Sequence, residues 1–218
     1  MKRRGVHCRM PLRERHQPAV GGPASLRHPV HVILIRQAQP ADDATLAQLD
    51  IATWTDDVSP APAPPADTPF FNERTRPGDV LVAEVDGAVV GYSKLGRSTK
   101  LLSREHVLDL NGLTVYPNRR RIGVGRALVE ASIEGARNRG ARKLSLRVLG
   151  GNTGARALYE ACGFVVEGVL REEFLLEGRY VDDVFMARHL VNEEPVPTTE
   201  GTGSNRATTS VRPGHVPE

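Results

Sequence analysis

Residues 113–128, with the sequence LTVYPNRRRIGVGRAL, decide how the rest of the chain is interpreted. The stretch begins as a strand, turns at Pro117, passes three successive arginines and continues with apolar residues at helical spacing. Gly123 and Gly125 stand where this helix begins. The first N–H groups of a helix lack partners within the helix, and the positive end of the helix dipole favours an anion there. Because glycines let a phosphate approach these amides, the stretch predicts a phosphate-binding turn.

Other phosphate-binding and catalytic motifs fit these letters poorly. Glycines at a helix start can also mean only a tight turn. A P-loop needs Gly-Lys-Ser/Thr, but Arg126 follows Gly125, and a dinucleotide fingerprint needs a small residue where Leu128 stands. A serine-hydrolase elbow is nearly matched from Gly91 onward, but Leu95 replaces its second glycine and the segment lies in an expected strand.

Strand and helix patterns alternate along the rest of the chain. Strands are expected at 32–36, 80–85, 88–95, 107–115, 144–148, 164–176 and 180–190, and helices at 42–52, 123–139 and 153–162. The pairs Asp86-Gly87 and Glu177-Gly178 are typical of hairpin turns. Residues 59–69 contain five prolines and predict a loop, and a short helix is possible after it at 70–76. The order predicts an α/β fold in which helices cover a mixed sheet.

Length and charge restrict the class of protein. The 218 residues suit one core of ordinary size, so we expect a single domain at 30–190. Residues 1–29 and 191–218 have no apolar periodicity and are expected to be disordered tails. The net charge of +3 reflects the first tail, which has seven Lys or Arg and one acid. The folded part therefore lacks the basic face of a nucleic-acid-binding domain, and a nucleic-acid partner is not favoured. A nucleic-acid-binding protein that uses the basic residues 1–29 is a third alternative, and deletion of these residues tests it.

Neither a membrane segment nor a metal site is indicated. No apolar run reaches the roughly 18 to 20 residues of a membrane-spanning helix or the about 7 to 15 of a signal-peptide core. A cytoplasmic location is therefore expected. Cys8 and Cys162 lie far apart, without further Cys or His at metal-ligand spacing, so we expect plain thiols, no disulfide framework and no bound metal.

Two motifs follow each other in the chain. Residues 120–125, RRIGVG, match the pattern Arg/Gln-x-x-Gly-x-Gly/Ala, and residues 152–164, NTGARALYEACGF, match Asn-x-x-Ala-x-x-Leu-Tyr-x-x-x-Gly-Phe. With these motifs the chain resembles the GNAT family of acyl-CoA-dependent N-acetyltransferases, and the resemblance covers residues 30–190. It implies the GNAT acyl-CoA N-acyltransferase fold, with a central mixed sheet of six to seven strands flanked by helices.

The resemblance also implies a binding site for acetyl-CoA as co-substrate. The pyrophosphate would lie against the turn and the helix start, and the pantetheine arm would pass between two parallel strands that splay apart. Asn152, an ordinary helix cap by default, would also contact the arm. The backbone of Leu113 and Val115 would guide the arm and polarise the thioester. The residues implied at the pyrophosphate are Arg120, Arg121, Gly123, Val124, Gly125 and Arg126.

Acyl transfer to an amine needs a neutral amine and a proton for the departing thiolate. Tyr159 occupies the general-acid position of the family, although it also lies on the apolar stripe of its own helix. Asp109 is the candidate base, since it would share a face of its strand with Leu113 and Val115. Glu105 and His106 are weaker candidates for the base, and the acids at 182–183 are expected to form surface or ion-pair contacts.

The expected activity is acetyl transfer to a primary amine by direct attack, without a covalent enzyme intermediate. The acceptor is an amino acid, a small amine or a protein N-terminus, and the resemblance does not choose among these. The alternative is a non-catalytic module that senses acyl-CoA and uses Tyr159 only for packing. A homodimer is left open. The determinants of the acceptor are expected in the loop at 54–71 and in the last hairpin.

Overall fold

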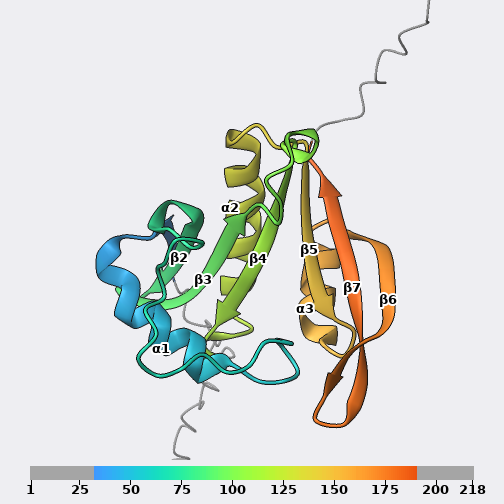
Figure 1. Ribbon diagram of the computed structural model, residues 1–218. Coiled ribbons are helices and arrows are strands. Elements are labelled where there is room, and N and C mark those ends of the chain that lie inside the picture. Colours follow the sequence, from blue (N-terminus) through green and yellow to red (C-terminus); the bar gives the residue numbers. More distant parts are fainter. Residues whose placement is uncertain (1–31, 191–218) are drawn as a thin grey trace, which may run out of the picture. The chain divides into compact units, whose positions relative to one another are not determined.

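The computed structural model describes residues 32–190, which form one seven-stranded sheet with three α-helices (Figure 1). Every expected strand and α-helix is confirmed, and its ends differ from the expectation by no more than one residue. The tails expected at 1–29 and 191–218 lie outside the described residues. The strands are β1 (Ile33–Gln37), β2 (Val80–Val85), β3 (Ala88–Gly96), β4 (Val107–Val115), β5 (Lys143–Leu149), β6 (Val165–Leu176) and β7 (Arg179–His189), and the helices are α1 (Asp43–Thr53), α2 (Val124–Asn138) and α3 (Thr153–Ala161).

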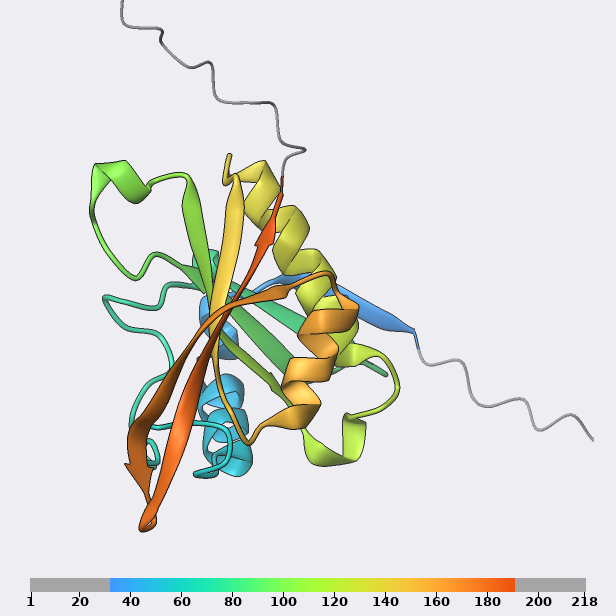
Figure 2. The same ribbon diagram turned by 90° about the vertical axis from the view of Figure 1, so that its right-hand side faces the viewer.

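The sheet has the order β1-β2-β3-β4-β5-β7-β6, and only β4 and β5 are parallel neighbours. Helices cover both faces (Figure 2). On one face Leu46 and Leu49 of α1 pack against β2 and β3; on the other, α2 and α3 pack around buried residues such as Leu144 and Phe164. We call these the α1 face and the α2–α3 face.

Both hairpins form as their turn residues predict. Asp86 and Gly87 have φ of 54° and 77°, and Glu177 and Gly178 have φ of 46° and 75°. Two central residues with positive φ match the right-handed twist of the flanking strands. The prediction of a short helix at 70–76 is wrong. There Asn72 accepts the N–H groups of Arg74 and Thr75 on its side chain, so these amides are taken by a local turn.

The parallel pair opens along its length. β4 and β5 are paired only from Val107↔Lys143 to Asp109↔Ser145, whereas β5 stays paired with β7 up to Leu149. In Figure 1 the two strands diverge from this closed end downward. The sequence-based expectation that these strands splay apart is confirmed, and the opening lies at the carboxyl end of β4, directly before the arginine turn and α2.

A β-bulge reverses the side-chain alternation within β4. Lys94 pairs with Gly112 and Leu95 with Leu110, so Asn111 is an extra residue without a partner on β3. Leu110 before the bulge and Leu113 after it consequently both pack on the α2–α3 face. The expectation that Asp109 shares a face with Leu113 and Val115 is therefore wrong, because simple alternation does not hold across a bulge.

Candidate active site

The start of α2 presents several amides without a backbone partner. Gly123 takes a left-handed conformation with φ of 98° and serves as the N-cap, with no side chain capping the helix. The first helical bond runs from Ala127 N–H to Gly123 C=O at 3.0 Å. Within the described part of the chain, the N–H groups of Val124, Gly125 and Arg126 therefore have no backbone acceptor. These groups and the helix dipole together favour an anion.

The arginine turn surrounds these amides with positive charge. Arg121 is exposed and has a φ of 67°, and Arg119 forms a 3.5 Å ion pair with Asp86. Arg126 lies 3.9 Å from Glu130 one helical turn later, and both side chains are more than half exposed. Arg120 turns back instead, and its Nε donates to the carbonyl of Val115 at 3.0 Å. The side chain of Arg120 thus also fastens the turn to the end of β4.

Gly125 has a packing role that the motif alone does not indicate. A β-carbon at this position would lie 3.1 Å from Cδ2 of Leu158, closer than ordinary van der Waals contact. The glycine therefore lets α2 and α3 approach each other beside the helix start, in addition to leaving its amide accessible.

The free edge of β4 offers backbone groups to the opening. The N–H of Tyr116 donates to the carbonyl of Val90 at 3.0 Å, so the backbone of Tyr116 points toward β3. In an antiparallel pair, successive residues point their N–H and C=O groups to opposite edges of the strand. Leu113 and Val115 therefore point theirs away from β3, into the opening, where β5 is not paired with them.

Tyr159 lies in α3, against the ring of Phe164 at a centroid distance of 5.8 Å, and only 7% of its surface is exposed. Burial raises the pKa of its hydroxyl to about 12, with a smaller contribution from the neighbouring Cys162. The hydroxyl forms no hydrogen bond with the described residues. At neutral pH the hydroxyl of Tyr159 is therefore protonated, and its proton is free to be donated to a bound ligand.

Asn152 caps α3, as expected. Its Oδ1 accepts the N–H of Ala155 at 3.1 Å. The side-chain amide of Asn152 keeps its own N–H donors at the carboxyl end of β5.

Asp109 is held at the closed end of the strand pair by four hydrogen bonds. Arg104 binds its two carboxylate oxygens at 2.7 and 2.9 Å, Ser145 donates at 2.5 Å and the N–H of Ser98 at 2.8 Å. Burial opposes ionisation, but the bonds from Arg104, Ser145 and Ser98 outweigh it and lower the pKa of Asp109 to about 2. A carboxylate with these donors accepts a proton poorly at neutral pH.

The position of Asp109 also argues against a role as the base. Leu113 lies four residues further along β4, roughly 13 Å at the usual rise per residue. We therefore correct the expectation: Asp109 anchors the 98–104 loop to β4 and β5, and the geometry does not favour it as the base.

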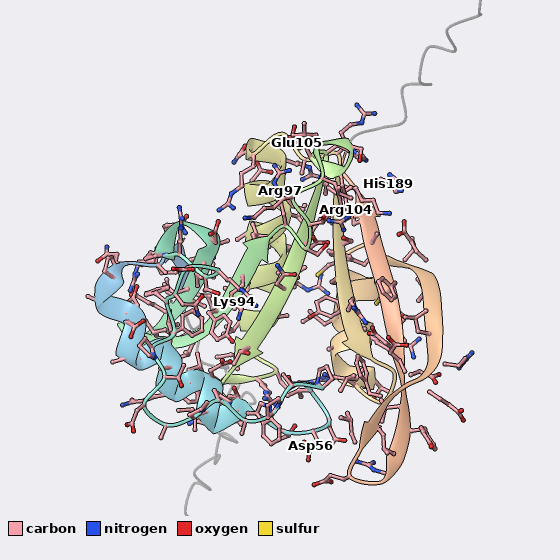
Figure 3. All side chains as sticks on the ribbon, in the orientation of Figure 1. Asp56, Lys94, Arg97, Arg104, Glu105 and His189 are labelled. Carbon is pink, nitrogen blue, oxygen red and sulfur yellow. The ribbon has the colours of Figure 1, made fainter. Side chains whose placement is uncertain are left out.

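The remaining candidates for the base are no better placed. Glu105 and His106 are exposed and directly precede β4, at the closed end, where Figure 3 labels Glu105. Asp182 pairs with Arg171 at 2.5 Å and the buried Asp183 pairs with Arg147, as the expected ion-pair role requires. The structure thus brings the arginine turn, Leu113 and Val115 to the opening, leaves Glu105 and His106 at the closed end, and holds Asp182 and Asp183 in ion pairs.

Sequence reasoning missed a group of side chains on the α1 face. Lys94 of β3 lies over the rings of Phe70 and Tyr92, at 5.4 and 5.9 Å from their centroids. The hydroxyl of Tyr92 donates to Asp50 of α1 at 2.5 Å. One signal was available: Gly112 interrupts a strand pattern, which is typical of a bulge or of a close approach by another group.

Comparison with known proteins agrees with this geometry. The model of the acetyltransferase (GNAT) family matches residues 45–164. The L-amino acid N-acyltransferase MnaT of Escherichia coli is 29% identical over 164 residues, covering 72% of this chain and 93% of the relative. The L-amino acid N-acetyltransferase AaaT of the same organism is 36% identical over 115 residues, covering 52% of this chain and 70% of the relative.

A solved structure of YncA from Salmonella typhimurium, with its cofactor acetyl-CoA, has the same fold. Its TM-score is 0.61 at 23% identity, with 77% of this chain and 99% of that chain covered. The chain belongs to the acetyltransferase (GNAT) family, as the two motifs indicated, and is an N-acetyltransferase. In the part of the chain that the structure describes, no helix is long and apolar enough to cross a membrane.

Proposed function

We propose that the chain transfers acetyl from acetyl-CoA to the primary amine of an amino acid, a small amine or a protein N-terminus, by direct attack. One observation carries the proposal. The opening between β4 and β5 leads directly to a cationic helix start whose amides have no backbone acceptor among residues 32–190. An opening for an extended arm beside a site for a diphosphate is the arrangement that a coenzyme A thioester requires.

The described residues fit acetyl-CoA in three places. The amides of Val124, Gly125 and Arg126, with the cations of the arginine turn, would hold the pyrophosphate. The N–H and C=O of Leu113 and the N–H of Val115 would bind the amides of the pantetheine arm, while the carbonyl of Val115 already accepts Nε of Arg120. The free N–H donors of Asn152 would reach the same arm, since the residue stands at the carboxyl end of β5.

When bound, acetyl-CoA supplies an activated acetyl group as its thioester. The hydroxyl of Tyr159 is the proton donor for the departing thiolate, and its raised pKa keeps the proton in place at neutral pH. We assign no side chain as the base, because Asp109 is committed to Arg104 and Ser145. The acceptor then attacks as the neutral amine, and turnover rises with pH as this form of the acceptor becomes more abundant.

Known relatives favour an amino acid as the acceptor. Two of them are an L-amino acid N-acyltransferase and an L-amino acid N-acetyltransferase. We also propose a cytoplasmic location and a homodimer.

A thiol-release assay tests the proposed function. The purified protein is incubated with acetyl-CoA and a panel of amino acids, simple amines and short peptides, while free coenzyme A is measured. Release that depends on the amine, with an equal amount of N-acetyl product, is expected. Acetyl-CoA should also raise the melting temperature more than ATP or NAD, because ligands that bind only the native state stabilise it. Stabilisation without turnover on any amine would favour the sensing module.

A further inference from the structure

Lys94 is placed beside the part of β4 that opens. It pairs with Gly112, which directly follows the bulge residue Asn111. A β-carbon at position 112 would lie 2.9 Å from Cε of Lys94 and 3.8 Å from its Nζ. The lysine side chain therefore crosses over Gly112, and a side chain there would displace it. Figure 3 shows Lys94 away from Arg104 and Glu105, which mark the closed end of β4.

The ammonium of Lys94 has aromatic neighbours and forms no ion pair with residues 32–190. The rings of Phe70 and Tyr92 hold it by cation–π contacts, which attract the charge without neutralising it. The carboxylate of Asp50 on the same face accepts the hydroxyl of Tyr92. The half-buried Lys94 thus offers an uncompensated positive charge on the face opposite α2 and α3.

The position of this charge suits one of the three acceptor classes. A carboxylate bound to Nζ would lie about 2.8 Å from it. In a free α-amino acid the amine is attached to the carbon that carries the carboxylate, so it would reach β4 at Gly112 and Leu113. In a peptide N-terminus the corresponding carbonyl is a neutral amide, and a simple amine has no such group.

We propose that Lys94 binds the α-carboxylate of the acceptor and so selects free amino acids over peptide N-termini and simple amines. This inference rests on the proposed function, because it places the thioester beside Leu113. Lys94 acts as a specificity-determining residue, and the apolar faces of Phe70 and Tyr92 keep its side chain in one position.

The test compares each amino acid with its own amide, which keeps the side chain and removes the negative charge. Values of kcat/KM are measured for L-methionine with L-methioninamide and for L-alanine with L-alaninamide. The variants are Lys94→Met, which keeps the packing of the stem, and Lys94→Arg, which keeps the charge. Lys100→Met, at an exposed lysine in the loop after β3, is the matched control for the loss of one charge. Acids and amides differ in amine basicity, so the ratio of acid to amide is compared between variants.

Lys94→Met is expected to lower the acid-to-amide ratio by about 10- to 100-fold, the range for a lost hydrogen bond between charged groups. Lys94→Arg should retain much of the ratio, and Lys100→Met all of it. Acetyl-CoA should stabilise every variant equally, which shows that each variant folds. Equal loss of activity on acids and amides would overturn the role of Lys94, as would an unchanged ratio. If the unmodified protein acetylated no amine at all, the proposed function itself would fail.

Discussion

Replacing Asp109 by Asn separates an anchoring carboxylate from a catalytic base. The change keeps the size of the side chain and lets it accept from Ser145, but removes the charge that faces Arg104. The pKa of Asp109 is lowered from 3.8 to about 2, and each unit corresponds to about 1.4 kcal/mol. The ionised form is therefore stabilised by up to about 2.5 kcal/mol in the native state. Because the side chain of Arg104 is 31% exposed and can regain water, we expect the substitution to lower the free energy of unfolding by about 2 kcal/mol.

The loss should depend on pH in a defined direction. A carboxylate with a depressed native pKa contributes stability above its unfolded pKa, and this contribution is lost as pH falls through the native pKa. The difference in free energy of unfolding between the unmodified protein and Asp109→Asn should have its full value at pH 7 and about half of that value at pH 3. Urea unfolding at both pH values measures it, and at pH 7 the melting temperature should fall by about 4 to 8 °C.

The same variant should keep its turnover within about threefold, since Asp109 lies at the closed end of the strand pair and its carboxylate is held by Arg104 and Ser145. Loss of a general base typically costs about 10²- to 10⁴-fold. Asp67→Asn, at an exposed residue of the proline-rich loop, is the control. Unchanged stability with a collapse of turnover would refute the anchoring role of Asp109 and restore it as the base.

Three further predictions concern binding, chemistry and domain limits. Gly125→Glu should weaken acetyl-CoA binding, measured by calorimetry, at least about 100-fold, and Gly125→Gln should weaken it less. Both side chains crowd Leu158, but only the glutamate repels the pyrophosphate. Equal losses of affinity in the two variants would contradict the electrostatic argument. Tyr159→Phe should leave the affinity for acetyl-CoA unchanged and lower kcat about 10²- to 10⁴-fold. With a pKa of about 12, Tyr159 should cause no alkaline decline of kcat below pH 10, and a decline near pH 8 that disappears in Tyr159→Phe would contradict this role. A fragment of residues 32–190 should fold and bind acetyl-CoA, and failure of either would show that the tails belong to the domain.

The secondary structure could be predicted because each element is determined locally. Apolar spacing identified the strands and helices, and the Asp-Gly and Glu-Gly pairs identified the turns. The segment at 70–76 failed because the side chain of Asn72 competes for the amides that a helix would use. Periodicity does not register such a local competition.

The arginine turn and the start of α2 could be predicted because one continuous motif contains their residues. The hydrogen-bond partners of Asp109 could not be predicted, because Ser98, Arg104 and Ser145 come from two different segments of the chain. The bulge at Asn111 reverses the face on which the later side chains of β4 lie, and Gly112, which interrupts the strand pattern, was its one signal in the sequence.

The most direct test of the central claim is to incubate the protein with acetyl-CoA and free L-amino acids and to follow two products together. Coenzyme A is measured by its thiol and the acetylated amino acid by mass spectrometry. We predict that both products appear in equal amounts, that their rate depends on the amino acid, and that Tyr159→Phe slows both. Binding of acetyl-CoA without an N-acetyl product from any amino acid, amine or peptide would contradict the claim that the opening between β4 and β5 is the active site of an N-acetyltransferase.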